Sequence, residues 1–149
     1  MPIIKNQQIT ENTWSYADDD QPLPEGNVTV SLARWNQEHA QLQQHSGKIG
    51  IRLIPTDQLE TLDNSQRPDL VELNFPSFGD GRLFSLARLL RDQHGYQGEI
   101  RATGNYLADQ VFYLHRVGVD SFEFTNPMDI QLALTAVNDF SVRYQPSSN

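Results

Sequence analysis

The stretch that decides the fold runs from Phe75 to Gly104 and reads FPSFGDGRLFSLARLLRDQHGYQGEIRATG. It begins at the end of an apolar run, passes through a turn rich in proline and glycine, continues as an amphipathic helix and finishes in a second strand. In the helical part, Leu83, Leu86, Ala87 and Leu90 fall on one face. A strand, a helix and a second strand joined by short connections predict a parallel β-α-β unit.

The same alternation continues on both sides of this unit. Strands are expected at about residues 49–54, 69–75, 99–103 and 121–125, and helices at about 57–62, 81–93, 107–118 and from 127 onward. In the third of these helices, Leu107, Val111 and Leu114 are expected to face inward. We therefore predict an α/β fold of four parallel β-α units, arranged either as an open doubly wound sheet or as a half-barrel-like sheet. The hydrophobic pattern leaves the order of the strands open.

The first 27 residues are predicted to form an irregular or β-hairpin arm, in which Ile3-Ile4 and Thr13–Tyr16 pair as short strands. An acidic loop rich in proline and glycine ends this arm. By its length, the whole chain of 149 residues is expected to be a single α/β domain that carries the arm at its start.

Local signals mark where helices begin and end. Ser31, Asp80 and Asn126 are predicted N-caps, because short polar side chains accept hydrogen bonds from the free N–H groups of a first helical turn. Pro127 suits the first helical position after Asn126. Gly95 is predicted to end the helix of the central unit, because glycine readily adopts a left-handed conformation.

Composition excludes several classes of function. The chain contains 19 acidic residues against 11 lysines and arginines, and its net charge of −8 argues against binding to nucleic acid or to an anionic membrane. It contains no cysteine, which excludes disulfides, thiolate nucleophiles and cysteine-ligated iron–sulfur clusters. We expect a cytoplasmic protein, because no signal-peptide pattern and no membrane-length apolar run is visible.

Positive charge nevertheless gathers around the central unit. Residues 76–118 have a net charge of +1, so the rest of the chain carries −9. The arginines of this segment are Arg82, Arg88, Arg91, Arg101 and Arg116. Such a cluster suits a small anion or an acidic patch on a partner, and the alternative is that these arginines only offset nearby carboxylates.

The turn before the central helix is the richest candidate site. Ligands of parallel α/β sheets bind beyond the carboxyl ends of the strands, which here means residues 55–57, 76–82, 104–106 and 125–127. In the second of these segments, free N–H groups at the helix start and the Arg82 guanidinium can hold a carboxylate, sulfate or phosphate. The alternative is structural, with Asp80 capping the helix and pairing with Arg82.

Other residues of the same region complete the candidate set. Arg101 lies in the middle of a strand, so it must be paired, lie at an edge or face a ligand. A salt bridge with Glu72, Glu99 or Glu123 is the favoured interpretation. The predicted anion-binding or partner-binding residues are Asp80, Gly81, Arg82, Arg101, Asp109 and Arg116.

No motif assigns a cofactor or a metal. The four histidines lack the spacing of metal ligands, and Gly79-x-Gly81 lacks the third glycine of a dinucleotide-binding loop. We therefore expect no cofactor and no metal, and the residues leave open whether the protein is an enzyme.

Three ordered blocks carry a family resemblance: FPSFGDGRLFSLARLLR, GEIRATG and LADQVFYLHRVGVDSFEF. They resemble a bacterial family classed as a domain of unknown function, whose members are often labelled "probable oxidoreductase involved in sulfite reduction". The resemblance covers about residues 28–125 and is strongest from Phe75 to Phe124. It implies a place in sulfur assimilation and supplies no catalytic residues. The matching motif residues include Asp80, Gly81, Arg82, Arg101, Asp109 and Arg116.

Three functional hypotheses follow. The first is an accessory protein of assimilatory sulfite reduction that binds sulfite reductase or another sulfur-assimilation protein, with the arginine-rich strand ends contributing to the contact. The second is an enzyme or sensor that binds a small oxyanion. The third is a structural homodimer.

Overall fold

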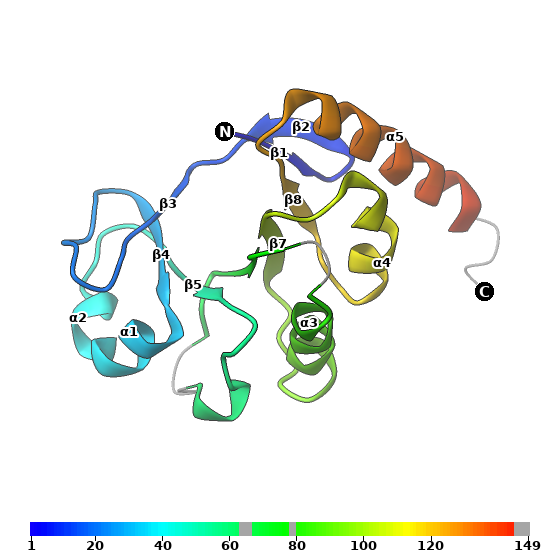
Figure 1. Cartoon of the computed structure of the whole chain (residues 1–149). Helices are drawn as coiled ribbons and strands as arrows, with labels where there is room; N and C mark the ends of the chain where they lie inside the picture. The colour runs from blue at the N-terminus through cyan, green and yellow to red at the C-terminus, as the bar shows by residue number, and fades with distance from the viewer. Residues whose placement is uncertain (63–66, 78–79, 145–149) are drawn as a thin grey trace.

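One curled sheet of eight strands organises the chain, and the helices lie around its outside (Figure 1). The computed structural model describes residues 1–62, 67–77 and 80–144. The strands are β1 (Pro2–Lys5), β2 (Gln8–Glu11), β3 (Trp14–Tyr16), β4 (Asn27–Ser31), β5 (Ile49–Leu53), β6 (Leu70–Phe75), β7 (Glu99–Gly104) and β8 (Ser121–Glu123). The helices are α1 (Leu32–Gln37), α2 (His39–Gln43), α3 (Arg82–Asp92), α4 (Val111–Arg116) and α5 (Pro127–Tyr144), with short 3₁₀ turns η1 (Leu59–Thr61) and η2 (Ala108–Gln110).

The strand order is β2-β1-β8-β7-β6-β5-β4-β3. The six strands from β3 to β8 are parallel and follow one another in sequence order, whereas β1 pairs antiparallel with both β2 and β8. Sequential right-handed crossovers place all the connecting helices on the same face of a sheet. The structure therefore confirms the predicted α/β fold and, of its two versions, the half-barrel-like one.

The curl of the sheet follows from the connection between its two edge strands. β2 and β3 lie at opposite edges, but only Asn12 and Thr13 separate them in sequence. Three peptide units span at most about 11 Å, so the edges must approach one another. The predicted pairing of Ile3-Ile4 with Thr13–Tyr16 is wrong, because Ile3 and Ile4 pair with β2 and β8, and β3 pairs with β4.

The outer face of the sheet carries the hydrophobic core. In the parallel strands, alternate apolar side chains are buried beneath the helices: Val28, Val30, Ile51, Leu53, Val71, Leu73, Ile100, Ala102 and Phe122. The α3 face is formed by Leu83, Leu86, Ala87 and Leu90, which are buried as predicted. The residues between these apolar positions point to the inner face of the curl.

Several predicted helix ends are confirmed. The Ser31 hydroxyl accepts a hydrogen bond from the Arg34 N–H (3.1 Å), and the Asn126 carboxamide accepts one from the Met128 N–H (3.0 Å) at the start of α5. Gly95 follows α3 with φ +62°.

Other local predictions are wrong. The predicted helix after Ser31 is interrupted at Glu38, which separates α1 from α2. Gly81, not Asp80, is the N-cap of α3, although Asp80 still accepts a hydrogen bond from the Arg82 N–H. Leu107 is 45% exposed, because it precedes η2 and α4 begins only at Val111.

Candidate functional site

A row of polar side chains crosses the inner face of the sheet. Strand register places these residues side by side on six neighbouring strands, in the order Ser31, Arg52, Glu72, Arg101, Ser121 and Lys5. We call this set the polar row. It alternates positive and negative charge over its central positions, so neighbouring side chains attract one another across the strands.

Glu72 lies at the centre of the polar row and is 2% exposed. Its Oε1 atom accepts hydrogen bonds from Arg52 Nε (2.9 Å) and from the Thr29 hydroxyl (2.9 Å). A buried carboxylate needs such partners, because an unpaired buried charge is costly. The β4, β5 and β6 strands are therefore joined through one carboxylate oxygen.

Arg101 joins the other side of the row to the N-terminal arm. Its Nε donates to the Ser121 hydroxyl (2.9 Å), Nη2 to Glu99 Oε2 (2.7 Å) and Nη1 to Asn12 Oδ1 (2.7 Å). Asn12 connects β2 to β3 and also donates to Glu123 Oε2 (2.7 Å). The predicted salt bridge of Arg101 is confirmed, with Glu99 as its partner.

Glu99 is held in its charged form by three neighbours. Burial raises the pKa of its carboxyl, but the Ser121 hydrogen bond, the Arg101 charge and the Lys5 ammonium outweigh burial, and the pKa lies below its ordinary value. Lys5 Nζ lies 3.0 Å from Glu99 Oε1, and Ser121 donates to Oε2 at 2.6 Å.

This depressed pKa predicts a specific loss of stability in acid. Glu99 stabilises the fold above the ordinary carboxyl pKa of 4.5, and this contribution disappears as pH falls through the lower pKa of the folded chain. The free energy of unfolding should therefore fall more steeply in the unaltered protein than in Glu99→Gln between about pH 5 and pH 3. Urea denaturation at each pH measures the difference, and parallel curves for the two proteins would contradict the assignment.

The six residues predicted to bind an anion or a partner do not gather in one place. Arg101 points to the inner face, whereas Asp109 in η2 and Arg116 at the end of α4 are exposed in the outer layer. The Arg116 guanidinium lies 5.6 Å from the centre of the Phe112 ring.

The turn before α3 holds a local ion pair. Arg82 donates through Nε and Nη2 to the two oxygens of Asp80 (3.0 and 2.7 Å), and its side chain is 62% exposed. Hydrogen bonding from Arg82 lowers the pKa of the Asp80 carboxyl. The residues just before this pair, Phe78 and Gly79, lie outside the described part of the chain.

A pocket of about 240 Å³ opens beyond the carboxyl ends of β7 and β8. Two of the strand-end segments expected to meet ligands contribute to it. It is lined by Gly104, Asn105, Tyr106, Leu107, Phe124, Thr125 and Asp129.

The floor of this strand-end pocket is aromatic and rigid. The Tyr106 and Phe124 ring centres lie 4.9 Å apart, and the Tyr106 hydroxyl donates to the Glu123 carbonyl (2.8 Å). Burial raises the pKa of Tyr106 well above its ordinary value, so the ring stays neutral. Gly104 has φ +88°, and a Cβ atom there would lie 2.5 Å from the Phe75 carbonyl oxygen, which explains glycine at this turn. Asp129 is the charged residue among the lining residues.

From residue 128 to residue 135, one face of α5 is uncharged and lies next to the pocket-lining residue Asp129. Met128, Gln131, Leu132 and Thr135 are exposed and share one side of the helix by their spacing. Met128 is 74% and Leu132 63% exposed. η2 packs against α5, and Leu107 lines the pocket together with Asp129. We call Leu107, Met128, Gln131, Leu132 and Thr135 together the α5 surface.

Sequence reasoning missed the α5 surface, although a signal was present. Leu132 falls off the helical face that contains Ile130 and Ala133, both of which are buried. A single exposed apolar residue is common on protein surfaces, but Leu132 lies one helical turn from Met128, and two large apolar residues together are compatible with a contact beyond the domain. The polar row had a similar signal, since each central strand places one polar residue between apolar ones, as in Ile51-Arg52-Leu53 and Val71-Glu72-Leu73.

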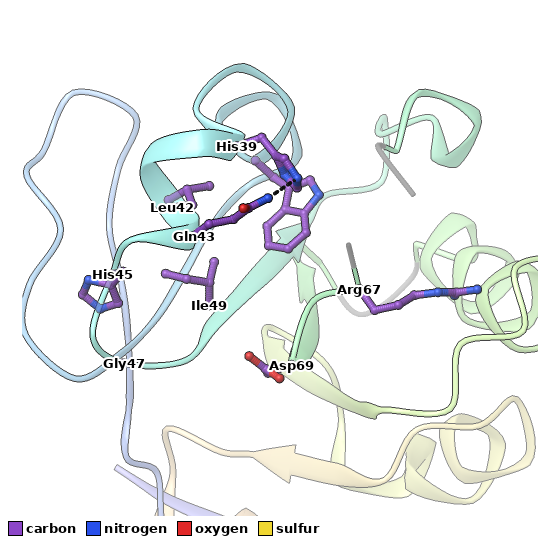
Figure 2. A pocket seen from close by; sticks show the side chains of 9 residues that line it. His39, Leu42, Gln43, His45, Gly47, Ile49, Arg67 and Asp69 are labelled. Carbon is purple, nitrogen blue, oxygen red and sulfur yellow. Dashed lines mark hydrogen bonds between the residues drawn. The ribbon is translucent and has the colours of Figure 1, made fainter. Parts of the chain in front are cut away.

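A second pocket, of about 150 Å³, lies at the opposite end of the strands, where β5 and β6 begin (Figure 2). Its two histidines are engaged: Gln43 Nε2 donates to His39 Nε2 (2.7 Å), and His45 Nε2 donates to the Gly26 carbonyl (2.6 Å). The Arg67 side chain points away from both histidines (Figure 2). The first contact lies within α2, and the second joins the segment after α2 to the loop before β4. Within the described residues no group of three or more histidines and carboxylates is arranged to hold a metal ion.

The fold and these surfaces define a class: a small α/β protein with a curled parallel sheet, a paired polar interior and an exposed apolar surface beside a strand-end pocket. The chain matches, over residues 50–149, the family described as "Bacterial protein of unknown function (DUF934)", and it belongs to that family. No curated protein and no solved structure matches it. In the part of the chain that the structure describes, no helix is both long and apolar enough to cross a membrane.

Proposed function

We propose that this protein is an accessory protein that binds a partner protein through the α5 surface and the strand-end pocket. The observation that carries the proposal is the exposed face of α5 between residues 128 and 135, with Met128 and Leu132 mostly in contact with solvent, beside a pocket that is lined by Tyr106 and Phe124. Contiguous exposed apolar groups beside a preformed pocket are typical of protein-binding sites.

The pocket specifies the chemistry of the partner. An aliphatic stem can pack on Tyr106 and Phe124 while its cationic end reaches the Asp129 carboxylate. A lysine or arginine side chain combines both features. The net charge of −8 also favours approach of a basic surface over long range. The expected partner surface is therefore apolar at its centre and basic at its edge.

The family resemblance directs the choice of partner. Its link to sulfite reduction makes sulfite reductase, or the protein that supplies its electrons, the partner that we propose. The chain contains no cysteine, so the redox groups of such a complex would belong to the partner.

A binding measurement with purified proteins tests this function. Immobilised full-length protein is expected to bind purified sulfite reductase holoenzyme or its electron donor, with an affinity that falls as salt rises. Lack of binding to both proteins at low salt would reject the proposed partner.

The homodimer hypothesis makes a different prediction about the oligomeric state. Light scattering should show a monomer if the α5 surface is kept for a partner. A dimer that dissociates in Leu132→Asp would instead assign this surface to a second copy of the chain.

Oxyanion binding at the turn before α3 has less support. Both Arg82 nitrogens that form the bidentate edge already bind Asp80. Calorimetric titration with sulfite or sulfate should show no heat that depends on Arg82, and heat that disappears in Arg82→Ala would restore the oxyanion hypothesis.

A further inference from the structure

We propose that Arg52 and Tyr16, on the inner face of the curled sheet, form a binding site for a small carboxylate. The site is separate from the α5 surface and does not depend on the proposed partner. It lies where the Arg52 guanidinium, bound on one edge by Glu72, lies 4.2 Å from the centre of the Tyr16 ring.

Arg52 is fixed on two sides but keeps one edge available. Its Nε donates to Glu72, and its guanidinium lies over the Tyr16 ring. Among the described residues, neither Nη1 nor Nη2 of Arg52 has a hydrogen-bond acceptor. The side chain is 23% exposed, so this edge reaches solvent without being fully solvated.

The other inward or buried arginines lack this feature. Arg34 already donates through Nη1 to the Asp18 carbonyl (2.6 Å). Every guanidinium nitrogen of Arg101 donates to a protein acceptor, and the same is true of Arg91, which binds the carbonyls of Tyr96, Gly98 and Gly118. A guanidinium that is held in place while its two terminal nitrogens stay open loses little conformational freedom when it binds a ligand.

Two neighbours on the same face can complete the site. The Tyr16 hydroxyl has no hydrogen-bond partner among the described residues, and Tyr16 lies on β3 beside Thr29 of β4. Asn74 lies one inward position beyond Glu72 on β6, and its Oδ1 accepts from the Thr103 hydroxyl (3.1 Å), which leaves its amide nitrogen as a donor.

The charges around the site decide the class of ligand. Glu72 already compensates the Arg52 charge, and Asp18 and Asp19, together with burial, raise the pKa of Tyr16. A doubly charged anion such as sulfate would meet these three carboxylates. A single carboxylate carries less charge, and its two oxygens match the parallel N–H groups of the open guanidinium edge.

Titration of the full-length protein with acetate and benzoate tests this site, with sodium chloride at equal ionic strength as the blank. Nitrogen-15 spectra should show a saturable shift of the Arg52 Nε–H resonance with the carboxylates and a weaker one, or none, with sulfate and phosphate. Arg52→Lys keeps the positive charge but removes the paired N–H groups, so it should weaken carboxylate binding at least tenfold. Tyr16→Phe should weaken it less, and Arg88→Lys, an exposed position on α3, should leave it unchanged.

Circular dichroism and thermal unfolding show whether each variant is folded. If Arg52→Lys does not fold, Tyr16→Phe still tests the site. No saturable shift with either carboxylate would overturn the proposal. Equal affinity of Arg52→Lys and the unaltered protein would do so as well. Tighter binding of sulfate or phosphate than of acetate at Arg52 would overturn the ligand class.

Discussion

Arg101→Ala is expected to lower the free energy of unfolding by about 3–5 kcal/mol, because it breaks an ion pair whose guanidinium is buried and removes the donor of three hydrogen bonds. The Arg101 side chain is 3% exposed and donates to Glu99, Ser121 and Asn12. Its removal also breaks the hydrogen bond that joins Asn12 of the arm to β7. Urea denaturation followed by circular dichroism measures the loss.

A matched control distinguishes the stability lost by breaking buried contacts from the stability lost by removing any arginine. Arg88 is exposed on α3, and Arg88→Ala should change the free energy of unfolding by no more than about 0.5 kcal/mol. The double variant Arg101→Met with Glu99→Gln should be more stable than Arg101→Ala, since methionine refills the buried volume and the charge that loses its partner belongs to Lys5, whose side chain is 42% exposed. Equal losses for Arg88→Ala and Arg101→Ala would show that the polar row does not stabilise the fold.

Leu132→Asp is expected to weaken partner binding by about 2 kcal/mol or more, a loss of roughly 30-fold in affinity. The substitution places a carboxylate at the centre of the exposed α5 face, where an apolar contact is expected. Leu132 is mostly exposed in the free protein, so the free energy of unfolding should change little. Biolayer interferometry against the purified partner measures the affinity.

Ser85→Asp provides the control for added charge. Ser85 is exposed on α3, away from the α5 surface, so the same new carboxylate should leave binding within a factor of about two. If Ser85→Asp and Leu132→Asp weaken binding equally, the effect is one of net charge and the α5 surface is not the contact.

Much of the fold could be predicted from sequence, because its signals are local. The apolar face of α3 and the caps at Ser31 and Asn126 depend on residues within one or two helical turns. The alternation of strands and helices then implied parallel pairing, but it left open whether the helices cover one face of the sheet or both.

The arm could not be predicted in the same way. β1 pairs with β8, more than 100 residues later in the chain, and no local pattern specifies that contact. The curl of the sheet depends on this pairing and on the hydrogen bonds of Asn12 to Arg101 and Glu123. The register of the sheet decides which side chains meet across strands that are distant in sequence, and the sequence alone does not specify that register.

The candidate sites, like the fold, could be predicted only where the signal in the sequence is local. A mid-strand arginine needs a partner, so the ion pair of Arg101 could be predicted from its position alone. Charge clustering in sequence did not translate into clustering in space, because Arg82 turns back to Asp80 while Arg101 faces the inside of the curl. The binding role proposed for Asp80, Gly81 and Arg82 stays a prediction.

Site-specific photo-crosslinking tests the central claim, that the α5 surface binds a sulfur-assimilation partner, most directly. A photoreactive amino acid is placed at position 132, or at position 88 as control, in cells that grow on sulfate as their sulfur source. Position 132, and not position 88, is expected to crosslink to sulfite reductase or its electron donor. Crosslinks from position 132 only to further copies of this chain, or the same products from both positions, would contradict it.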